Sequence, residues 1–363
     1  MESKKITLSD IAKIAGVTIG TVDRAMHNRP GISEETRKRI LEIAKKYNYR
    51  PDLIGRSLSM KGKKIKIGVL LRSNPSFFWD HVAGGIRAAA KEVEVFGVEP
   101  IIEFYQIPKD FTDDDYVNAC RDKLRKFAED KNNACIVVPL HLRSCLEDIN
   151  YLTEKEIPTV TLNDDIEDSK RIFHIGPDNY QSGRLAAQLA GDFLAGKGRV
   201  LLYTAGYSSY GYYYRKVGFM DKMRESFPSI QVVERNNKTI EEAFFGEDID
   251  IRSFDLVCNV DGDTVSKGVD LLVQSNDIRR MKYIGFEIND QAKEYLSKGL
   301  IQGIISQDGF SQGYFAMRML CESLIFGKKP KYDTMYVRID IILKENMIIN
   351  DRIVNPYFMG ISV

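Results

Sequence analysis

The chain has 363 residues, of which 44% are hydrophobic and 28% are charged. This length predicts two or three domains, and the composition is typical of soluble globular proteins, which excludes disordered, collagen-like and coiled-coil classes. No apolar run reaches the ~20 residues of a membrane span, and the first residues, MESKKITLSD, lack the apolar core of a secretory signal. The five cysteines have no paired spacing, which favours reduced thiols in a cytoplasmic protein over disulfides or a zinc site.

Charge is distributed unevenly along the chain. Residues 1–64 hold 15 Lys and Arg against 7 Asp and Glu, whereas the remaining residues hold 37 against 44. A short basic segment ahead of a mildly acidic body is typical of a nucleic-acid-binding module joined to a domain with another role. On charge alone, a solvated basic tail is the alternative.

The basic segment carries the pattern of three short helices. Thr7 and Asp10 have the spacing of a capping box, and Gly16 is expected to end the helix that follows them. Thr18 is expected to cap a second helix, and Ser33 a third. Two short helices joined through a glycine are the signature of a helix-turn-helix motif.

In a helix-turn-helix, the early residues of the second helix meet base edges in the major groove of DNA. Arg24 is the best candidate for a bidentate contact to guanine, and Ile19 is placed to touch a thymine methyl group. Further expected DNA contacts, of which the threonines suit phosphates, are Thr7, Thr18, Gly20, Thr21, Asp23, His27 and Asn28. A solvated surface arginine is the alternative for Arg24.

This part of the chain resembles the DNA-binding headpiece of the LacI/GalR family of bacterial transcription regulators. The resemblance rests on the gap-free segment AGVTIGTVDRAMHNRPGISEETRKRILEIAKKYNYRPDLIGRSL, with departures at Asp23, where Ser is usual, and at His27-Asn28, where Asn-Gly is usual. It implies that RPDLIGRSL is a hinge helix that folds on DNA and wedges Leu58 into the minor groove. Arg56 is a further expected DNA contact in this segment. Packing of a linker residue on the body is the alternative for Leu58.

From residue 65 onward, short apolar runs rich in β-branched residues alternate with helical patterns, which predicts doubly wound parallel sheets. The predicted strands are Ile65–Leu71, Pro100–Ile107, Cys135–Pro139, Pro158–Leu162, Ile172–Ile175, Val200–Tyr203, Ile230–Val233, Phe254–Val260, Tyr283–Ile288 and Ile301–Ser306. They are too many for one sheet, and the series begins again near Ile172, so we expect two lobes. The predicted domains are 1–49, a hinge at 50–64, and 65–363, with lobe 1 about 65–163 and 293–325 and lobe 2 about 164–292 and 326–363.

Two such lobes leave a cleft, because ligands bind open α/β sheets outside the carboxyl ends of the strands. Rings, amides, carboxylates and an arginine follow the predicted strands, Trp79 and Asp164 among them, and this mixture suits a polyhydroxylated ligand. The alternatives are a role in the lobe core for the aromatic residues 77–79, a subunit surface for the tyrosines at 207–214, and a helix cap for Asp261.

Residues 65–345 resemble the sugar-binding core shared by the same regulators and the periplasmic sugar-binding proteins, with ribose-type binders most similar. The shared motifs are SNPSFF, TVTLND, RKVGF, NVDGD, IGFEIND and GIISQDG. Taken position by position, the resemblance implies ligand contacts from Asn74, Phe77, Phe78, Asn163, Arg215, Asp261, Glu287 and Gln307. Asn163-Asp164 replaces an Asp-Arg pair and Glu287 replaces Asp, which predicts a different sugar or another polar ligand.

The predicted fold is an all-α helix-turn-helix headpiece followed by a type I, two-lobed α/β core like that of periplasmic binding proteins, with two doubly wound parallel sheets. We predict a transcription repressor that binds palindromic operator DNA as a homodimer and responds allosterically to a sugar-like effector. The alternatives are a solute-binding protein of a sugar transporter and an enzyme; for the enzyme, Asp261 and Glu287 form a carboxylate pair, but no nucleophile or phosphate loop is marked. No cofactor and no metal site are predicted.

Overall fold

The computed structural model describes residues 6–26, 29–47, 64–73, 76–105, 113–139, 142–205 and 210–347. The chain divides into two compact units, one small and N-terminal, here called the headpiece, and one that begins at Lys64 and holds both sheets, here called the body. Among the described helices, none combines the length and apolar character that a bilayer-crossing segment requires.

The headpiece consists of α1 (Leu8–Ala15), α2 (Ile19–Met26) and α3 (Glu34–Lys46). The predicted capping box is present, because the Thr7 hydroxyl accepts from the Asp10 N–H while the Asp10 carboxylate accepts from the Thr7 N–H at 3.0 Å. Gly16 ends α1 with a φ of 65°, a left-handed conformation that favours glycine. The three helices share one small core, formed by Ile11, Ala12, Ala15, Val22, Ala25, Ile40 and Ala44.

The body contains two six-stranded sheets, and each predicted strand has an observed counterpart. The first sheet has the order β11-β5-β4-β3-β1-β2, formed by Thr334–Tyr336, Phe173–Gly176, Thr159–Leu162, Ala134–Val137, Ile65–Arg72 and Val98–Tyr105. The second sheet has the order β12-β10-β9-β8-β6-β7, formed by Ile339–Ile342, Gly303–Gln307, Lys282–Phe286, Leu256–Asn259, Gly198–Tyr203 and Ile230–Arg235. Every pairing is parallel except that of β12 with β10, so the predicted fold class is confirmed.

Three strands lie in the sheet opposite to the predicted lobe. One is β11, which pairs with β5 in the first sheet although the predicted lobe 2 included 326–363. β5 pairs with β4 in the first sheet, although the predicted lobe 2 began at residue 164, and β10 pairs with β9 in the second sheet, although the predicted lobe 1 included 293–325. The lobe ranges were therefore wrong at these strands. The physical reason is that a short apolar run fixes strand character but does not specify which strands it pairs with. β11 and β12 were not predicted.

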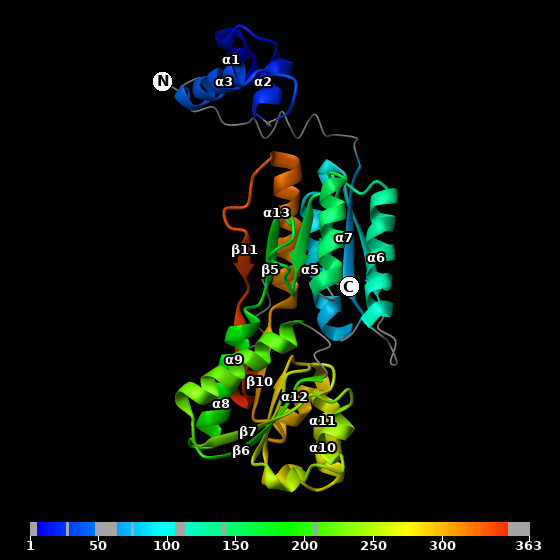
Figure 1. The fold of residues 1–363 in the computed structure, drawn as a ribbon, viewed down its shortest axis with the longest axis vertical. Helices are drawn as coiled ribbons and strands as arrows, with labels where there is room; N and C mark the ends of the chain where they lie inside the picture. The colour runs from blue at the N-terminus through cyan, green and yellow to red at the C-terminus, as the bar shows by residue number, and fades with distance from the viewer. Residues whose placement is uncertain are drawn as a thin grey trace. The chain divides into compact units, whose positions relative to one another are not determined.

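Helices cover both sheets, and each sheet with its helices forms one lobe (Figure 1). In the first lobe, α6 (Asp113–Glu129) and α7 (Leu142–Glu154) share a core with Leu70 and Val137 of the sheet. In the second lobe, α8 (Asn179–Phe193) and α9 (Tyr210–Ser226) lie on one face, against Val200 and Leu202. The opposite face, which includes Leu201 and Tyr203, packs against α10 (Ile240–Phe245), α11 (Val265–Gln274) and α12 (Asp290–Ser297). Successive strand residues thus point to opposite faces, as the pleat requires.

Each lobe also holds one helix pair whose backbones nearly touch. A Cβ atom on Gly183 of α8 would lie 1.9 Å from the Arg215 carbonyl oxygen of α9, and one on Gly218 of α9 would lie 2.0 Å from the Tyr180 carbonyl oxygen. In the first lobe, α5 (Ser76–Glu92) and α13 (Gly309–Phe326) meet in the same way through Gly85 and Gly313. Because only glycine leaves room for such an approach, these residues fix where α9 carries its arginine.

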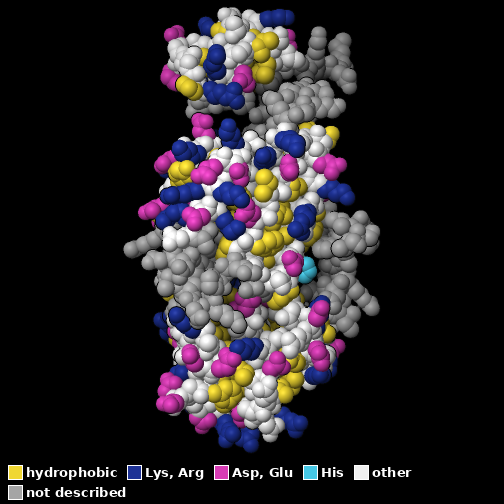
Figure 2. Space-filling view, turned by 90° about the vertical axis from the view of Figure 1, so that its right-hand side faces the viewer, with side chains coloured by type: hydrophobic (Ala, Val, Ile, Leu, Met, Phe, Trp, Pro, Cys, Tyr) yellow, Lys and Arg dark blue, Asp and Glu magenta, His cyan; other side chains and the backbone are white. Residues whose placement is uncertain are grey.

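Figure 2 shows acidic and basic side chains interspersed over the face of the body in view, rather than gathered by sign. Ion pairs between neighbouring helices and strands account for part of this pattern. Arg184 of α8 holds Glu225 of α9 at 2.6 Å, and Lys123 of α6 holds Glu103 of β2 at 2.7 Å. The excess of basic over acidic residues in this chain lies in residues 1–64.

Candidate functional site

The outer face of α2 carries the residues predicted to contact bases. Val22 and Ala25 are buried in the headpiece core, whereas Ile19 is 52% exposed and Gly20 and Arg24 are also exposed. An exposed isoleucine leaves apolar surface in contact with water, which is unfavourable in free energy unless another molecule covers it. The arrangement therefore leaves one apolar and one guanidinium group of α2 exposed.

Asp23 lies beside these residues, and its charge is countered within the headpiece. Its carboxylate accepts a hydrogen bond from Arg29 at 3.0 Å, and Arg37 in turn donates to the backbone carbonyl oxygens of Arg24 and Arg29. The ion pair reduces the repulsion that an acid on this face would exert on phosphate. Four of the predicted DNA contacts, His27, Asn28, Arg56 and Leu58, lie outside the described residues.

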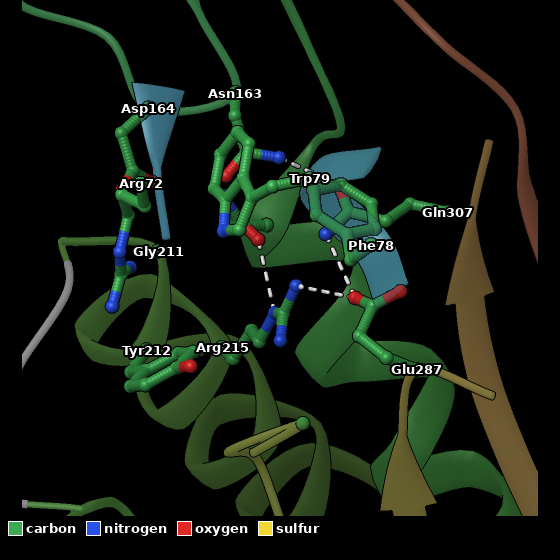
Figure 3. Close-up of a pocket in the computed structure, with 12 residues that line it drawn as sticks. Arg72, Phe78, Trp79, Asn163, Asp164, Gly211, Tyr212, Arg215, Glu287 and Gln307 are labelled. Atoms are coloured by element: carbon green, nitrogen blue, oxygen red, sulfur yellow. Dashed lines mark hydrogen bonds and ion pairs between the residues drawn. The ribbon is translucent and has the colours of Figure 1, made fainter. Parts of the chain in front are cut away.

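In the body, a small cavity of about 30 Å³ lies between side chains of both lobes (Figure 3). Its lining includes seven of the predicted ligand contacts, namely Phe78, Trp79, Asn163, Asp164, Arg215, Glu287 and Gln307. Phe77 is half-buried and does not line the cavity, and Asn74 lies outside the described residues. The structure therefore brings together residues that are more than 200 positions apart in the chain.

Arg215 occupies the centre of this site. Its Nε donates to Asn179 Oδ1 at 3.0 Å, one terminal nitrogen donates to the Val260 carbonyl at 3.0 Å, and the other lies 3.4 Å from Glu287 Oε1 (Figure 3). The guanidinium also lies 4.3 Å from the ring centre of Phe286, within cation–π range. Arg215 and Glu287 are both buried, so each charge needs the opposite charge of the other to offset the hydration that it loses.

A chain of amide groups continues from Glu287 to the first lobe. Gln307 Nε2, at the end of β10, donates to Glu287 Oε1 at 2.7 Å, and Asn163, just after β4, donates to Gln307 Oε1 at 3.0 Å. Burial raises the pKa of Glu287, while Arg215 and Gln307 favour the charged form. Asn163 and Glu287 both have a positive φ, of 67° and 60°, which turns their side chains into the cleft at a conformational cost of about 1–3 kcal/mol each. Strained backbone of this kind is commonly found at binding sites.

Asp261 and the aromatic residues have partners that bear on the alternative interpretations. The Asp261 carboxylate accepts from the Tyr212 hydroxyl at 2.9 Å, from the Asp263 N–H at 3.0 Å and from the Thr264 hydroxyl at 2.9 Å, and it does not line the cavity. These bonds order the loop before α11, so they favour the structural role. Phe78 and Trp79 meet edge to face at 4.9 Å and are both buried, so they belong to the lobe core and line the cavity as well.

Five residues that line the cavity were not among the predicted ligand contacts, although Tyr212 belongs to the tyrosine cluster considered at 207–214: Arg72, Asn179, Gly211, Tyr212 and Gly262. Arg72 ends β1, and Asn179 begins the helix after β5, so the rule that ligands lie beyond strand ends would have included both. Gly211 had no comparable signal. A Cβ atom there would lie 2.8 Å from Asp164 Oδ1, a proximity that only the fold reveals.

Both units match known protein families. Residues 7–52 match the bacterial regulatory proteins of the lacI family, and residues 67–329 match the periplasmic binding protein domain. The resemblance inferred from sequence is thereby confirmed for the headpiece and for the body.

Curated relatives are named as transcription regulators. The chain is 31% identical over 170 residues to the probable HTH-type transcriptional repressor ExuR of Bacillus subtilis (strain 168), covering 45% of this chain and 44% of that protein. It is 37% identical over 92 residues to the HTH-type transcriptional regulator MalR of Streptococcus pneumoniae, covering 24% and 28%. The chain thus matches less than half the length of these relatives. Their names agree with the prediction that the chain is not an enzyme.

Solved structures share the fold of the body. GanP, a glucose-galactose binding protein from Geobacillus stearothermophilus, superposes with a TM-score of 0.69 at 25% identity, covering 78% of this chain and 99% of that one. A carbohydrate transporter solute binding protein from Agrobacterium radiobacter, in complex with D-arabinose, superposes with a TM-score of 0.68 at 20% identity, covering 82% and 98%. The second similarity concerns the fold alone.

Proposed function

The chain belongs to the periplasmic binding protein domain family and carries the DNA-binding domain of lacI-family regulators, and from this we propose that it is a sequence-specific transcription repressor controlled by a sugar-like effector. The observation that carries the proposal is the presence of both domains in one chain. A binding protein that serves only a transporter has no use for a helix-turn-helix, whereas a regulator needs a sensor.

The effector site is the cavity around Arg215. Its lining offers buried hydrogen-bonding groups of both kinds, together with the rings of Phe78 and Trp79. Hydroxyl groups match such a set, because each can donate to a carboxylate and accept from an arginine or amide, while rings cover the apolar face of a sugar. The cavity has room for little more than a water molecule, so binding requires the lobes to part or the internal hydrogen bonds to exchange for bonds to the ligand.

The headpiece supplies the DNA contact, and two copies are needed. One small helix-turn-helix makes too few contacts for specific affinity at physiological salt, and a two-fold dimer reads two half-sites of a palindrome. We therefore propose a cytoplasmic homodimer on operator DNA. An effector that prefers one arrangement of the lobes changes operator affinity, and by linkage the operator changes effector affinity by the same factor.

A binding-site selection with the purified full-length protein tests this function. We expect enrichment of a palindromic sequence that binds at least ~10³-fold more tightly than random competitor at physiological salt. A thermal-shift screen of monosaccharides, disaccharides and sugar acids, repeated with that operator, then identifies the effector class and the sign of its coupling. If no sequence is enriched, with or without candidate effectors, the proposed function is wrong.

A further inference from the structure

A second, larger hollow adjoins the cavity around Arg215. It has a volume of about 470 Å³ and shares Asn163, Asp164 and Asn179 with the smaller cavity. We call it the outer chamber. Pockets for small organic ligands have volumes of about 300–1,000 Å³, so the outer chamber has the size of a binding site whereas the inner cavity does not. A ligand that reaches the inner polar groups therefore extends into this space.

The outer chamber is lined by carboxylates and by no lysine or arginine among the described residues. The carboxylates are Asp164, Asp165, Glu167, Asp168 and Asp178. Arg171 neutralises only Asp165, with contacts of 2.5 and 2.6 Å, and Asp178 accepts the Gln181 N–H as the cap of α8. Glu167 and Asp168 are exposed, and no ion pair joins either of them to a described side chain. Among the described residues that line it, the chamber therefore carries an excess of negative charge.

Tyrosine rings form another part of its wall. Tyr180, Tyr210, Tyr214 and Tyr336 line the chamber, and Tyr210 meets Tyr214 edge to face at 4.8 Å. The face of a tyrosine ring attracts cations. Burial, together with Asp178 and Glu167, raises the pKa of Tyr336, so its phenol stays neutral. Carboxylates and ring faces around one volume form the combination that recognises organic ammonium groups.

We propose that the outer chamber binds a positively charged amino group of the effector, which makes the effector an amine-bearing sugar. This inference rests on the proposed function, because it assigns the polyhydroxylated part of the same ligand to the groups around Arg215. A sugar acid would meet several like charges in the chamber, and a neutral sugar would bring no counter-charge to Glu167 and Asp168. Charge complementarity therefore selects the amine.

Calorimetric titration of the full-length protein with matched sugars tests the proposal. The panel is glucosamine, galactosamine, mannosamine and the β-1,4-linked glucosamine disaccharide, each beside its hydroxyl-bearing parent, at mildly acidic pH where the amines are protonated. We expect at least one amine to bind ten or more times as tightly as its parent. The double variant Glu167→Gln, Asp168→Asn should lose most of that preference, whereas Glu129→Gln, an exposed carboxylate at the end of α6, should keep it.

Three outcomes would overturn the assignment of the chamber. The parents or a sugar acid bind as tightly as the amines; the preference for an amine persists unchanged in the double variant; or no member of the panel binds. Operator selection with the same preparation separates this failure from that of the proposed function. A protein that enriches a palindrome but ignores amines is a regulator whose effector belongs to another chemical class.

Discussion

The headpiece and the body cleft organise their functional side chains in opposite ways. On α2 the side chains of Ile19 and Arg24 are exposed, and the helix beneath them is held by a core made largely of small residues. In the cleft, Arg215 and Glu287 are buried and hydrogen-bonded to each other, so these functional groups also stabilise the second lobe. Recognition and stability are therefore separable in the headpiece and coupled in the cleft.

We expect the largest effect from removal of Arg215, which tests whether recognition and stability are coupled in the cleft. Arg215→Ala leaves the Glu287 carboxylate buried without its cation, and we expect a loss of about 3–5 kcal/mol in the free energy of unfolding, together with loss of any effector-induced thermal shift. Denaturant unfolding measures the first effect. Arg224→Ala is the control, because Arg224 is exposed on the same helix and its ion pair with Asp221 is worth no more than ~1 kcal/mol. Equal stability of the two variants would show that the cleft tolerates an unpaired charge, and the coupling would be refuted.

Two adjacent glycines in α5 test how far the stability of the body depends on the close contact between the backbones of α5 and α13. A Cβ atom on Gly85 would lie 2.1 Å from the Phe310 carbonyl oxygen, whereas one on Gly84 would lie 3.9 Å from the nearest atom, in the Phe310 ring. We expect Gly85→Ala to destabilise the body by about 1–3 kcal/mol or more through overpacking. Gly84→Ala should be neutral or stabilising by up to ~1 kcal/mol, since alanine favours helix. A thermal unfolding midpoint that is the same for both variants would mean that α5 and α13 are free to move apart.

In the headpiece we expect the reverse: loss of a functional side chain lowers DNA binding and leaves stability nearly unchanged. Arg24→Ala should cost ~1–3 kcal/mol in operator binding and relax base choice at one position. Stability should change by less than ~0.5 kcal/mol, because Arg24 is exposed. A repeated binding-site selection gives the base preference, and Arg39→Ala, an exposed arginine on α3, is the control. An unchanged preference would remove Arg24 from base recognition.

The same contrast explains what the sequence could predict. The headpiece follows from signals a few residues apart, such as the Thr7–Asp10 box and Gly16, because helix caps act within one turn. Ten of the twelve described strands of the body were also predictable from apolar runs, and β11 and β12 were not. Which sheet β5 and β10 join was not, because the apolar run of a strand does not specify its pairing partners. In the cleft, most residues followed from strand ends and from the resemblance, but Gly211 became visible only when α9 was placed against Asp164.

The smallest expected effect concerns the cap that holds α1 in the headpiece. Thr7→Ala removes the hydroxyl that accepts the Asp10 N–H, and the loss of such a cap costs about 1 kcal/mol. In the absence of DNA, amide hydrogen exchange of the full-length protein should therefore speed up in α1 while the protection of α3 changes less. Thr7→Ser keeps the hydroxyl and should restore the protection.

Because Thr7 was also predicted to contact DNA, operator affinity alone would not separate its two roles, whereas exchange without DNA reports only the cap. Unchanged protection in Thr7→Ala would mean that the shared core, and not the capping box, holds the start of the headpiece.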